Sequence, residues 1–298
     1  MQRFHALTWM AALLGSCDGS KDSSCVLDHG AMVDTPPGLC IARNFSGVAT
    51  DEEALANAMD DMERVGAVAL RSDLLWHIVE PEPGVWDFSR YDALVDALEG
   101  RDMELIALLA YGNPWASSET SNEWTYPPDN PADFANFAAE VANRYAGRVT
   151  RYEIWNEPNA GRFWRPGISG DPEAWGELAL QAARAIRSED STAEVILGGT
   201  FFPAQVIMGG EEFVRRAIAA HPDLLMEADT FAVHPYPTYP PQVAPESEEN
   251  GNTPLVDVVS TMRDLTDGMP VMISEYGWPV WGEVDVEIQG QFLERAAL

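Results

Sequence analysis

Short apolar runs alternate with amphipathic segments from about residue 40 onward, which is typical of βα units around a parallel sheet. The predicted strands are residues 40–45, 67–71, 103–111, 151–155, 194–198, 230–234 and 271–274. The predicted helices are residues 51–66, 87–101, 131–148, 172–187, 211–220, 254–265 and 286–298, with Thr50 as the N-cap of the first. Seven βα units of an eightfold pattern predict an α/β fold, a (β/α)8 TIM barrel truncated after its seventh βα unit.

The eighth βα unit is the part of this pattern that the sequence does not supply, since the chain stops at Leu298. A sheet of seven strands leaves its first and last strands with unpaired edges, which a closed barrel avoids. Either the chain is a fragment, or another segment fills the gap. Residues 26–39 are the only spare candidate, and the run Asp34-Thr35-Pro36-Pro37 suits a central strand poorly. We therefore expect a fragment.

The first residues depart from the alternating pattern and are predicted to be a processing segment. Arg3 precedes a short apolar stretch at residues 6–14, which is too short to span a membrane and is typical of a signal peptide over residues 1–16. Leu14-Gly15-Ser16-Cys17 resembles a bacterial lipoprotein signal, in which Cys17 becomes the lipidated first residue. A plain secretory signal cleaved nearby is the alternative. The predicted location is the bacterial cell envelope, as a lipoprotein, or the medium.

The cysteine count agrees with lipidation. Once Cys17 is modified, Cys25 and Cys40 are left to form a disulfide in an oxidising compartment. Residues 17–39 are then a lipidated tether and N-terminal extension, and residues 40–298 form one barrel domain.

The net charge of the chain limits the classes of binding partner that can be expected. The net charge of −30 argues against nucleic acid and against an anionic membrane surface, because both recruit Lys and Arg, so membrane contact is expected only through the lipid anchor. Acidic polysaccharides are disfavoured for the same reason. No cluster of His, Cys and Asp has metal-site spacing, so neither a metal nor a cofactor is predicted. The protein is expected to be a monomer.

Two glutamates carry the candidate chemistry. Glu157 lies in Trp155-Asn156-Glu157-Pro158, and Glu275 lies in Ile273-Ser274-Glu275-Tyr276-Gly277. Each follows a predicted buried strand and precedes a Pro or Gly turn signal. Glycoside hydrolysis needs such a pair, because one carboxyl protonates the leaving oxygen while the other attacks or assists at the anomeric carbon.

Four motifs now support a resemblance. Arg71 with the following Trp76 and residues 79–84, the Asn156-Glu157-Pro158 turn, Val233-His234-Pro235-Tyr236 and the Ser274-Glu275-Tyr276 segment occur in barrel order. Together they resemble clan A glycoside hydrolases, nearest to families 39 and 5. The resemblance implies a glycoside hydrolase TIM-barrel domain over residues 40–298.

The resemblance also implies roles for single residues. Glu157 matches the general acid/base and Glu275 the nucleophile of a retaining mechanism. Tyr236 matches a hydroxyl donor to the nucleophile, and Asn156 matches the residue that binds the sugar 2-hydroxyl.

Strand geometry adds supporting residues. Arg71 ends the second strand and is expected to hold Glu275 ionised. His234 shares a strand face with Tyr236. Glu153 shares a face with Glu157 by the two-residue period, and a buried carboxylate there needs a partner, for which Arg71 is the candidate.

Aromatic residues concentrate in the loops that follow the strands, on the face where barrel enzymes have their sites. Their flat rings suit the C–H faces of sugars, so Trp115, Trp164 and Trp278 are expected to bind substrate, with loop packing as the alternative. The leading hypothesis is a retaining glycosidase that cleaves β-linked neutral glycans or glycosides such as xylan, glucan or mannan. The alternative is a carbohydrate-binding surface lipoprotein that has lost turnover.

Overall fold

The computed structural model of the chain describes residues 11–15, 38–119, 124–202, 208–236, 244–248 and 253–277. Its centre is one sheet in the spatial order β1 to β8. Seven of these strands run parallel, and each pairs with the next: β2 (Gly38–Ala42), β3 (Ala67–Leu75), β4 (Glu104–Ala110), β5 (Arg151–Ile154), β6 (Glu194–Phe201), β7 (Thr230–His234) and β8 (Val271–Ile273). The predicted α/β barrel architecture with seven parallel strands is therefore confirmed.

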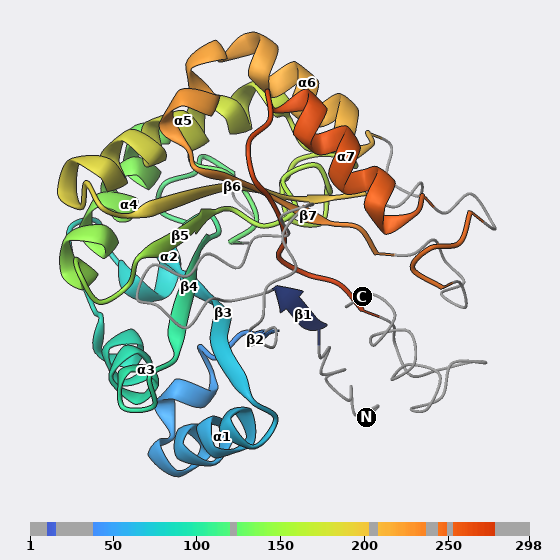
Figure 1. Cartoon of the computed structure of the whole chain (residues 1–298). Helices are drawn as coiled ribbons and strands as arrows, with labels where there is room; N and C mark the ends of the chain where they lie inside the picture. The colour runs from blue at the N-terminus through green and yellow to red at the C-terminus, as the bar shows by residue number, and fades with distance from the viewer. Residues whose placement is uncertain are drawn as a thin grey trace, which may run out of the picture.

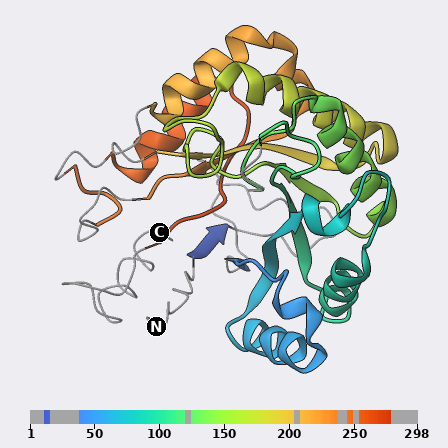
Figure 2. The same cartoon turned by 180° about the vertical axis from the view of Figure 1, so that it is seen from behind.

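The helices form an outer arc around the curled sheet (Figures 1 and 2). Six correspond to predicted helices: α1 (Glu52–Arg64), α3 (Ser89–Glu99), α4 (Pro131–Tyr145), α5 (Pro172–Glu189), α6 (Gly210–Ala220) and α7 (Leu255–Leu265). Three short elements were not predicted: η1 (Val48–Thr50), α2 (Trp76–Val79) and η2 (Pro222–Glu227). The predicted helix at 286–298 lies outside the described residues. Among the described helices, none has the length and apolar character needed to span a membrane.

The start of α1 corrects one prediction. Its N-cap is Asp51, whose carboxylate accepts a hydrogen bond from the backbone N–H of Ala54 at 3.0 Å. Thr50 is instead the last residue of η1, where its hydroxyl donates to the carbonyl of Gly47 at 2.8 Å. The N-cap is the extended residue directly before the first helical one, and Asp51, with φ of −125° and ψ of 110°, has that place before Glu52.

The outer edge of β2 is covered by a segment that the sequence pattern did not suggest. Strand β1 (Ala11–Gly15) pairs antiparallel with β2, with Ala11 opposite Ala42 and Gly15 opposite Gly38. Backbone groups of β2 that would otherwise lack partners are thus hydrogen-bonded. This strand lies within the predicted signal peptide, which itself stays a prediction.

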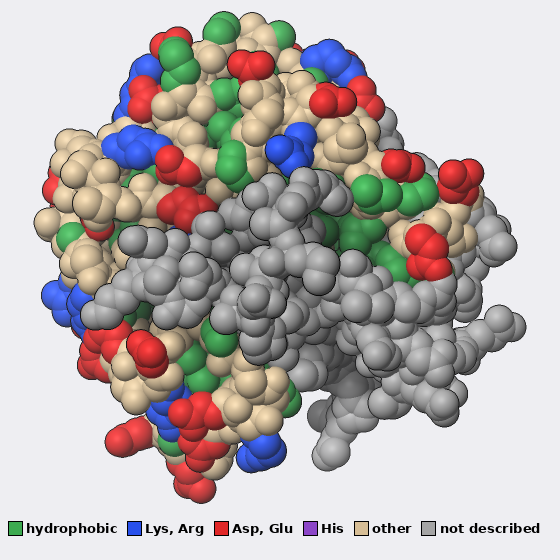
Figure 3. Space-filling model, viewed as in Figure 1, with side chains coloured by type: hydrophobic (Ala, Val, Ile, Leu, Met, Phe, Trp, Pro, Cys, Tyr) green, Lys and Arg blue, Asp and Glu red, His purple; other side chains and the backbone are tan. Residues whose placement is uncertain are grey.

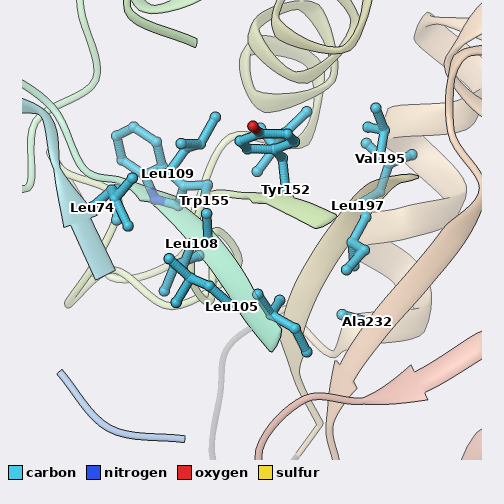
Figure 4. Close-up of a cluster of buried hydrophobic side chains, with 14 of the residues drawn as sticks. Leu74, Leu105, Leu108, Leu109, Tyr152, Trp155, Val195, Leu197 and Ala232 are labelled. Carbon is cyan, nitrogen blue, oxygen red and sulfur yellow. The ribbon is translucent and has the colours of Figure 1, made fainter. Parts of the chain in front are cut away.

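The main core fills the space between the sheet and the helices. Figure 4 shows Leu109 of β4, Tyr152 of β5 and Val195 and Leu197 of β6, with Leu108 on the other face of β4. All five side chains are fully buried. Burial of each such aliphatic or aromatic side chain stabilises the fold by about 1.5–3 kcal/mol. This packing fixes the strands, and hence the side chains at their ends.

Acidic residues are spread over the helices with arginines between them, as the visible face in Figure 3 shows. Several arginines join neighbouring helices: Arg144 of α4 pairs with Asp92 of α3, and Arg216 of α6 pairs with Glu173 of α5. Each exposed pair is worth about 1 kcal/mol or less.

Candidate active site

The predicted site residues meet at the carboxyl ends of four strands. His234 ends β7, whereas Arg71 lies in the middle of β3 and not at its end as predicted, and its guanidinium reaches Glu275 and Asn156. Glu157 follows β5 by three residues, and Glu275 follows β8 by two. Because parallel strands present their carboxyl ends at one edge of the sheet, residues from positions 71 to 275 form one cluster.

A strained turn positions Glu157. Trp155 and Glu157 both have positive φ angles, 66° and 43°, in the left-handed region that side chains other than glycine rarely adopt. The N–H of Trp155 donates to the carbonyl of Leu109, and that of Glu157 donates to the carbonyl of Gly199, both at 3.0 Å. These bonds to β4 and β6 hold a conformation that costs about 1–3 kcal/mol per residue, as is common at functional sites.

Glu275 receives donors at both carboxylate oxygens. An N–H of Arg71 donates to Oε1 at 2.6 Å, and the hydroxyl of Tyr236 donates to Oε2 at 2.7 Å. Burial by itself would raise the pKa of Glu275, but the charge that His234 has when protonated, the charge of Arg71 and these hydrogen bonds outweigh it. The pKa of Glu275 is therefore lowered, and the group is ionised at neutral pH. Its side chain remains 23% exposed, so a ligand can reach it.

Glu157 has the opposite character. Burial raises its pKa above the ordinary value for glutamate, and the negative charge of Glu275 adds to this shift; the hydrogen bond and charge that His234 has when protonated oppose it. Its Oε1 lies 3.0 Å from Nδ1 of His234. The pKa values of the two carboxyls are therefore shifted in opposite directions, which is the arrangement needed for acid and nucleophile roles.

Glu157, His234 and Glu275 each contribute an atom to a group in which all atoms lie within 4.8 Å of one another. Sequence spacing did not reveal this convergence of possible metal donors. Both oxygens of Glu275 are already hydrogen-bonded, one of them to the cationic Arg71, whose charge opposes a metal ion at the same place. The donor set therefore fits a carboxyl pair better than a metal site.

The predicted partner of Glu153 is confirmed. Nε of Arg71 donates to Oε2 of Glu153 at 2.5 Å and another guanidinium N–H donates to Oε1 at 2.9 Å, while a third bond at 3.0 Å reaches Oδ1 of Asn156. Arg71 is 3% exposed and Glu153 is fully buried. Arg71 thus links β3, β5 and the residue after β8, and orients Asn156 as well as Glu275.

One glycine, Gly199, makes room for this ion pair. Strand β6 changes register between Gly198 and Thr200, and Gly199 has φ of +60°. A Cβ at Gly199 would lie 2.8 Å from Oε1 of Glu153 and 3.3 Å from Nε2 of His234. Only glycine suits both this backbone conformation and this close approach.

The three tryptophans predicted to bind substrate lie in different settings. Trp164 is 3% exposed and packs on Trp155, with ring centroids 4.9 Å apart, so it supports the Glu157 turn from beneath and does not offer a ring face to a ligand. Trp115 is partly buried, donates to the carbonyl of Glu80 and contacts Trp76 edge-on. Trp278 lies outside the described residues. Loop packing therefore describes Trp164, and the role of Trp115 stays a prediction.

Sequence reasoning overlooked three polar residues near the pair. Ser274 is fully buried and bonds to both His234 and Glu153. Tyr111 is 4% exposed, and burial together with the charges of Asp73, Glu275 and Glu157 raises the pKa of its hydroxyl. Burial raises the pKa of Asp73 to about 6, against the charge of Arg71. Asp73 lies two residues after Arg71, so the two-residue period could have identified it.

Of the three cysteines in the predictions, only Cys40 lies among the described residues. Cys40 is buried in β2 and forms no disulfide with another described residue, and burial raises its pKa to about 12. Cys17 and Cys25 lie outside the described residues, so the lipidation at Cys17 and the disulfide between Cys25 and Cys40 stay predictions.

Known proteins with a similar sequence are glycoside hydrolases. A model of the family Cellulase (glycosyl hydrolase family 5) matches residues 38–289. Endo-1,4-beta-xylanase C of Phanerodontia chrysosporium is 25% identical over 150 residues, which cover 47% of this chain and 37% of that xylanase. Endo-1,4-beta-xylanase A of the same organism is 24% identical over 149 residues, 47% of this chain and 36% of that enzyme. The chain thus spans little more than a third of the length of these relatives.

Solved structures show the same fold. A family 39 glycoside hydrolase from Bacteroides cellulosilyticus WH2 matches with a TM-score of 0.64 at 17% identity, covering 98% of this chain and 67% of that one. A monomeric beta-xylosidase from Caulobacter crescentus CB15 matches with a TM-score of 0.60 at 20% identity, covering 80% and 52%. The predicted resemblance to clan A, near families 39 and 5, is confirmed by these matches.

Proposed function

Since the chain belongs to the cellulase family, glycosyl hydrolase family 5, we propose that it is a retaining glycoside hydrolase that cleaves β-linked neutral glycans or glycosides. The observation that carries this proposal is the carboxyl pair. Oxygens of Glu157 and Glu275 lie within 4.8 Å of each other. Retaining enzymes have their carboxyl groups about 5–5.5 Å apart, whereas inverting enzymes leave about 6.5–9.5 Å for a water molecule.

The proposed reaction has two displacements. Glu157 gives its proton to the glycosidic oxygen as that oxygen leaves, while a carboxylate oxygen of Glu275 forms a bond to the anomeric carbon. Water then attacks this carbon, its proton returns to Glu157, and the bond to Glu275 breaks, so the configuration is retained. The raised pKa of Glu157 and the lowered pKa of Glu275 suit the first step.

The supporting residues act on these two steps. Arg71 and Tyr236 hold Glu275 ionised and aimed, and Asn156, fixed by Arg71, is proposed to bind the sugar 2-hydroxyl. Xylan, glucan and mannan are the proposed substrate classes. The net charge of −30 disfavours acidic polysaccharides, and the similar proteins include xylanases and a xylosidase.

The test is hydrolysis by the chain of 4-nitrophenyl β-glycosides, xylan, glucan and mannan, with Glu157→Gln and Glu275→Gln alongside. Glu173→Gln, at an exposed ion pair between α5 and α6, is the control. We expect both site variants to lose at least about 1000-fold in kcat, the control to keep its activity, and the first product to have the β configuration by NMR. Hydrolysis with inversion would contradict the retaining mechanism.

The second candidate function, a carbohydrate-binding surface lipoprotein without turnover, predicts a different result. Such a protein binds oligosaccharide, hydrolyses none of the panel, and binds equally well as Glu275→Gln. Both carboxyls and their hydrogen bonds are intact, which favours the enzyme.

Export as an envelope lipoprotein is proposed on the segment around Cys17. If Cys17 is lipidated, the wild-type chain should incorporate labelled palmitate and Cys17→Ser should not. A wild-type chain that is secreted without incorporating the label supports a plain signal peptide. Monomeric behaviour on size exclusion is expected.

A further inference from the structure

A buried hydroxyl joins the two halves of the site. Oγ of Ser274 lies 3.1 Å from Oε1 of Glu153 and 3.0 Å from Nε2 of His234. All three side chains are fully buried. No water is needed to complete these contacts, so the positions of their hydrogens follow from counting donors and acceptors.

The count begins at Glu153. Its carboxylate accepts two charge-assisted hydrogen bonds from Arg71, so it is ionised and can only accept. The single hydrogen of Ser274 must therefore point to Glu153, since two acceptors 3.1 Å apart repel each other. Once Ser274 has donated its hydrogen, it can only accept from His234. Nε2 of His234 is therefore the protonated nitrogen.

This tautomer decides what His234 presents to the carboxyl pair. A neutral imidazole with its hydrogen on Nε2 has a lone pair on Nδ1. Nδ1 lies 3.0 Å from Oε1 of Glu157 and 3.8 Å from Oε2 of Glu275. The lone pair repels an ionised Glu157 but accepts a hydrogen bond from a protonated one. When His234 takes a second proton, Nδ1 donates to Glu157, so one proton again lies at this contact.

We propose that Ser274, held by Glu153, is a positioning residue that selects the Nε2–H tautomer of His234 and thereby keeps the acid proton on Glu157. The proposal rests on the proposed hydrolase function and adds a residue that touches neither substrate nor the reacting atoms. The charged and titratable groups that face the pair are Arg71, Glu275 and Tyr236. Asp73 interacts with Glu275 through its charge, and Tyr111, whose pKa is raised, is neutral.

The first experiment is the pH profile of kcat/KM for Ser274→Ala. Without the hydroxyl, a neutral His234 can carry its hydrogen on Nδ1 and donate it to ionised Glu157, which then loses its proton at lower pH. The basic limb, measured with the 4-nitrophenyl glycoside that the panel identifies, should move down by about one pH unit, the size of one hydrogen bond to a charged group. Ser274→Thr keeps the hydroxyl and should restore the wild-type limb.

Two controls separate this role from packing. Ser72→Ala removes another buried serine hydroxyl, one that accepts from the N–H of Phe45, and should leave the limb unchanged. The 2,4-dinitrophenolate leaving group departs from its glycoside without needing a proton. The basic limb of kcat/KM for this substrate should therefore be insensitive to Ser274→Ala. An equal shift with both leaving groups, or in both alanine variants, would overturn the proposal.

The second experiment does not depend on activity. In ¹⁵N-histidine-labelled protein, the signal that disappears in His234→Gln should report the Nε2–H tautomer in the wild type and the Nδ1–H tautomer in Ser274→Ala. A wild-type Nδ1–H tautomer refutes the proposal. If the panel shows no hydrolysis, the proposed function fails while the NMR result still decides this one. If Ser274→Ala does not fold, the wild-type spectrum decides it.

Discussion

Replacing Glu153 with glutamine should lower the free energy of unfolding by about 3–5 kcal/mol. The substitution keeps the size of the side chain but removes its charge, and its amide N–H groups face the N–H groups of Arg71. The amide oxygen can still accept one bond from Arg71 or Ser274. What is lost is the charge that compensates a guanidinium only 3% exposed.

The magnitude follows from burial. Arg71 keeps its hydrogen bonds to Glu275 and Asn156, but Glu275 is partly solvated and Asn156 is neutral. A buried charge that loses its partner is strongly destabilising, whereas an exposed pair contributes about 1 kcal/mol or less. Glu173→Gln is the matched control, because Arg216 makes three hydrogen bonds to one carboxylate there, against two from Arg71 to Glu153, but with 43% and 46% exposure.

Urea unfolding followed by tryptophan fluorescence measures both variants, with the midpoint and slope fitted separately. We expect Glu153→Gln to lose at least about 2 kcal/mol more than Glu173→Gln. Equal losses at unchanged slope would show that burial of the Arg71–Glu153 pair does not set its energetic weight, and would refute the reasoning.

Three further changes probe the surroundings of the site. Tyr236→Phe removes a hydrogen-bond donor from Glu275, so the lowered pKa of Glu275 should rise. The acid limb of the pH profile of kcat/KM should then move up by about one pH unit, and an unmoved limb contradicts this. The ionised Glu275 carboxylate stabilises the fold at pH values above the pKa that it has in the unfolded chain, and this contribution is lost as the pH falls through its pKa in the folded protein. The contribution should be smaller in Tyr236→Phe. Gly199→Ala adds a methyl 2.8 Å from Oε1 of Glu153 at a φ of +60°, so stability should fall by about 1–3 kcal/mol in urea melts, and wild-type stability would show that the backbone can adjust. In a variant in which serine replaces Cys17 and Cys25, Cys40 should not react with Ellman's reagent at pH 8 while the protein is folded, since burial raises its pKa to about 12. In urea it should react, and labelling of the folded protein at the rate of an exposed thiol would disprove this.

Local patterns predicted most of the scaffold because they reflect local physics. The six helices from α1 to α7 other than α2 follow apolar periodicity and lie within a few residues of their predicted bounds. The strands were underestimated where they carry polar residues: β3 extends to Leu75 through Ser72 and Asp73, which interrupt the apolar run. Burial of a polar side chain at the mouth of a barrel depends on partners from other strands, so a local pattern could not reveal it.

Some of the site residues could likewise be predicted from the sequence, and others could not. Motifs identified Glu157, Glu275 and Tyr236. The two-residue period put Glu153 on the face of Glu157, and its need for a partner when buried indicated Arg71. The same signals did not distinguish Trp164 as a packing residue, because an aromatic side chain in a loop has the same sequence signature whether its face is covered or open.

The sequence by itself determined the order of strands and helices, the carboxyl pair and its aromatic surroundings, because these depend on periodicity and on residue type. The tertiary structure decided that oxygens of Glu157 and Glu275 approach within 4.8 Å, and that the pKa of one is raised while that of the other is lowered. It also decided that Ser274 lies between Glu153 and His234, whose positions differ by 81 residues (234 − 153) along the chain. Distances and charges between residues so far apart are set by how the sheet curls and how its strands register, and no local stretch of sequence encodes either.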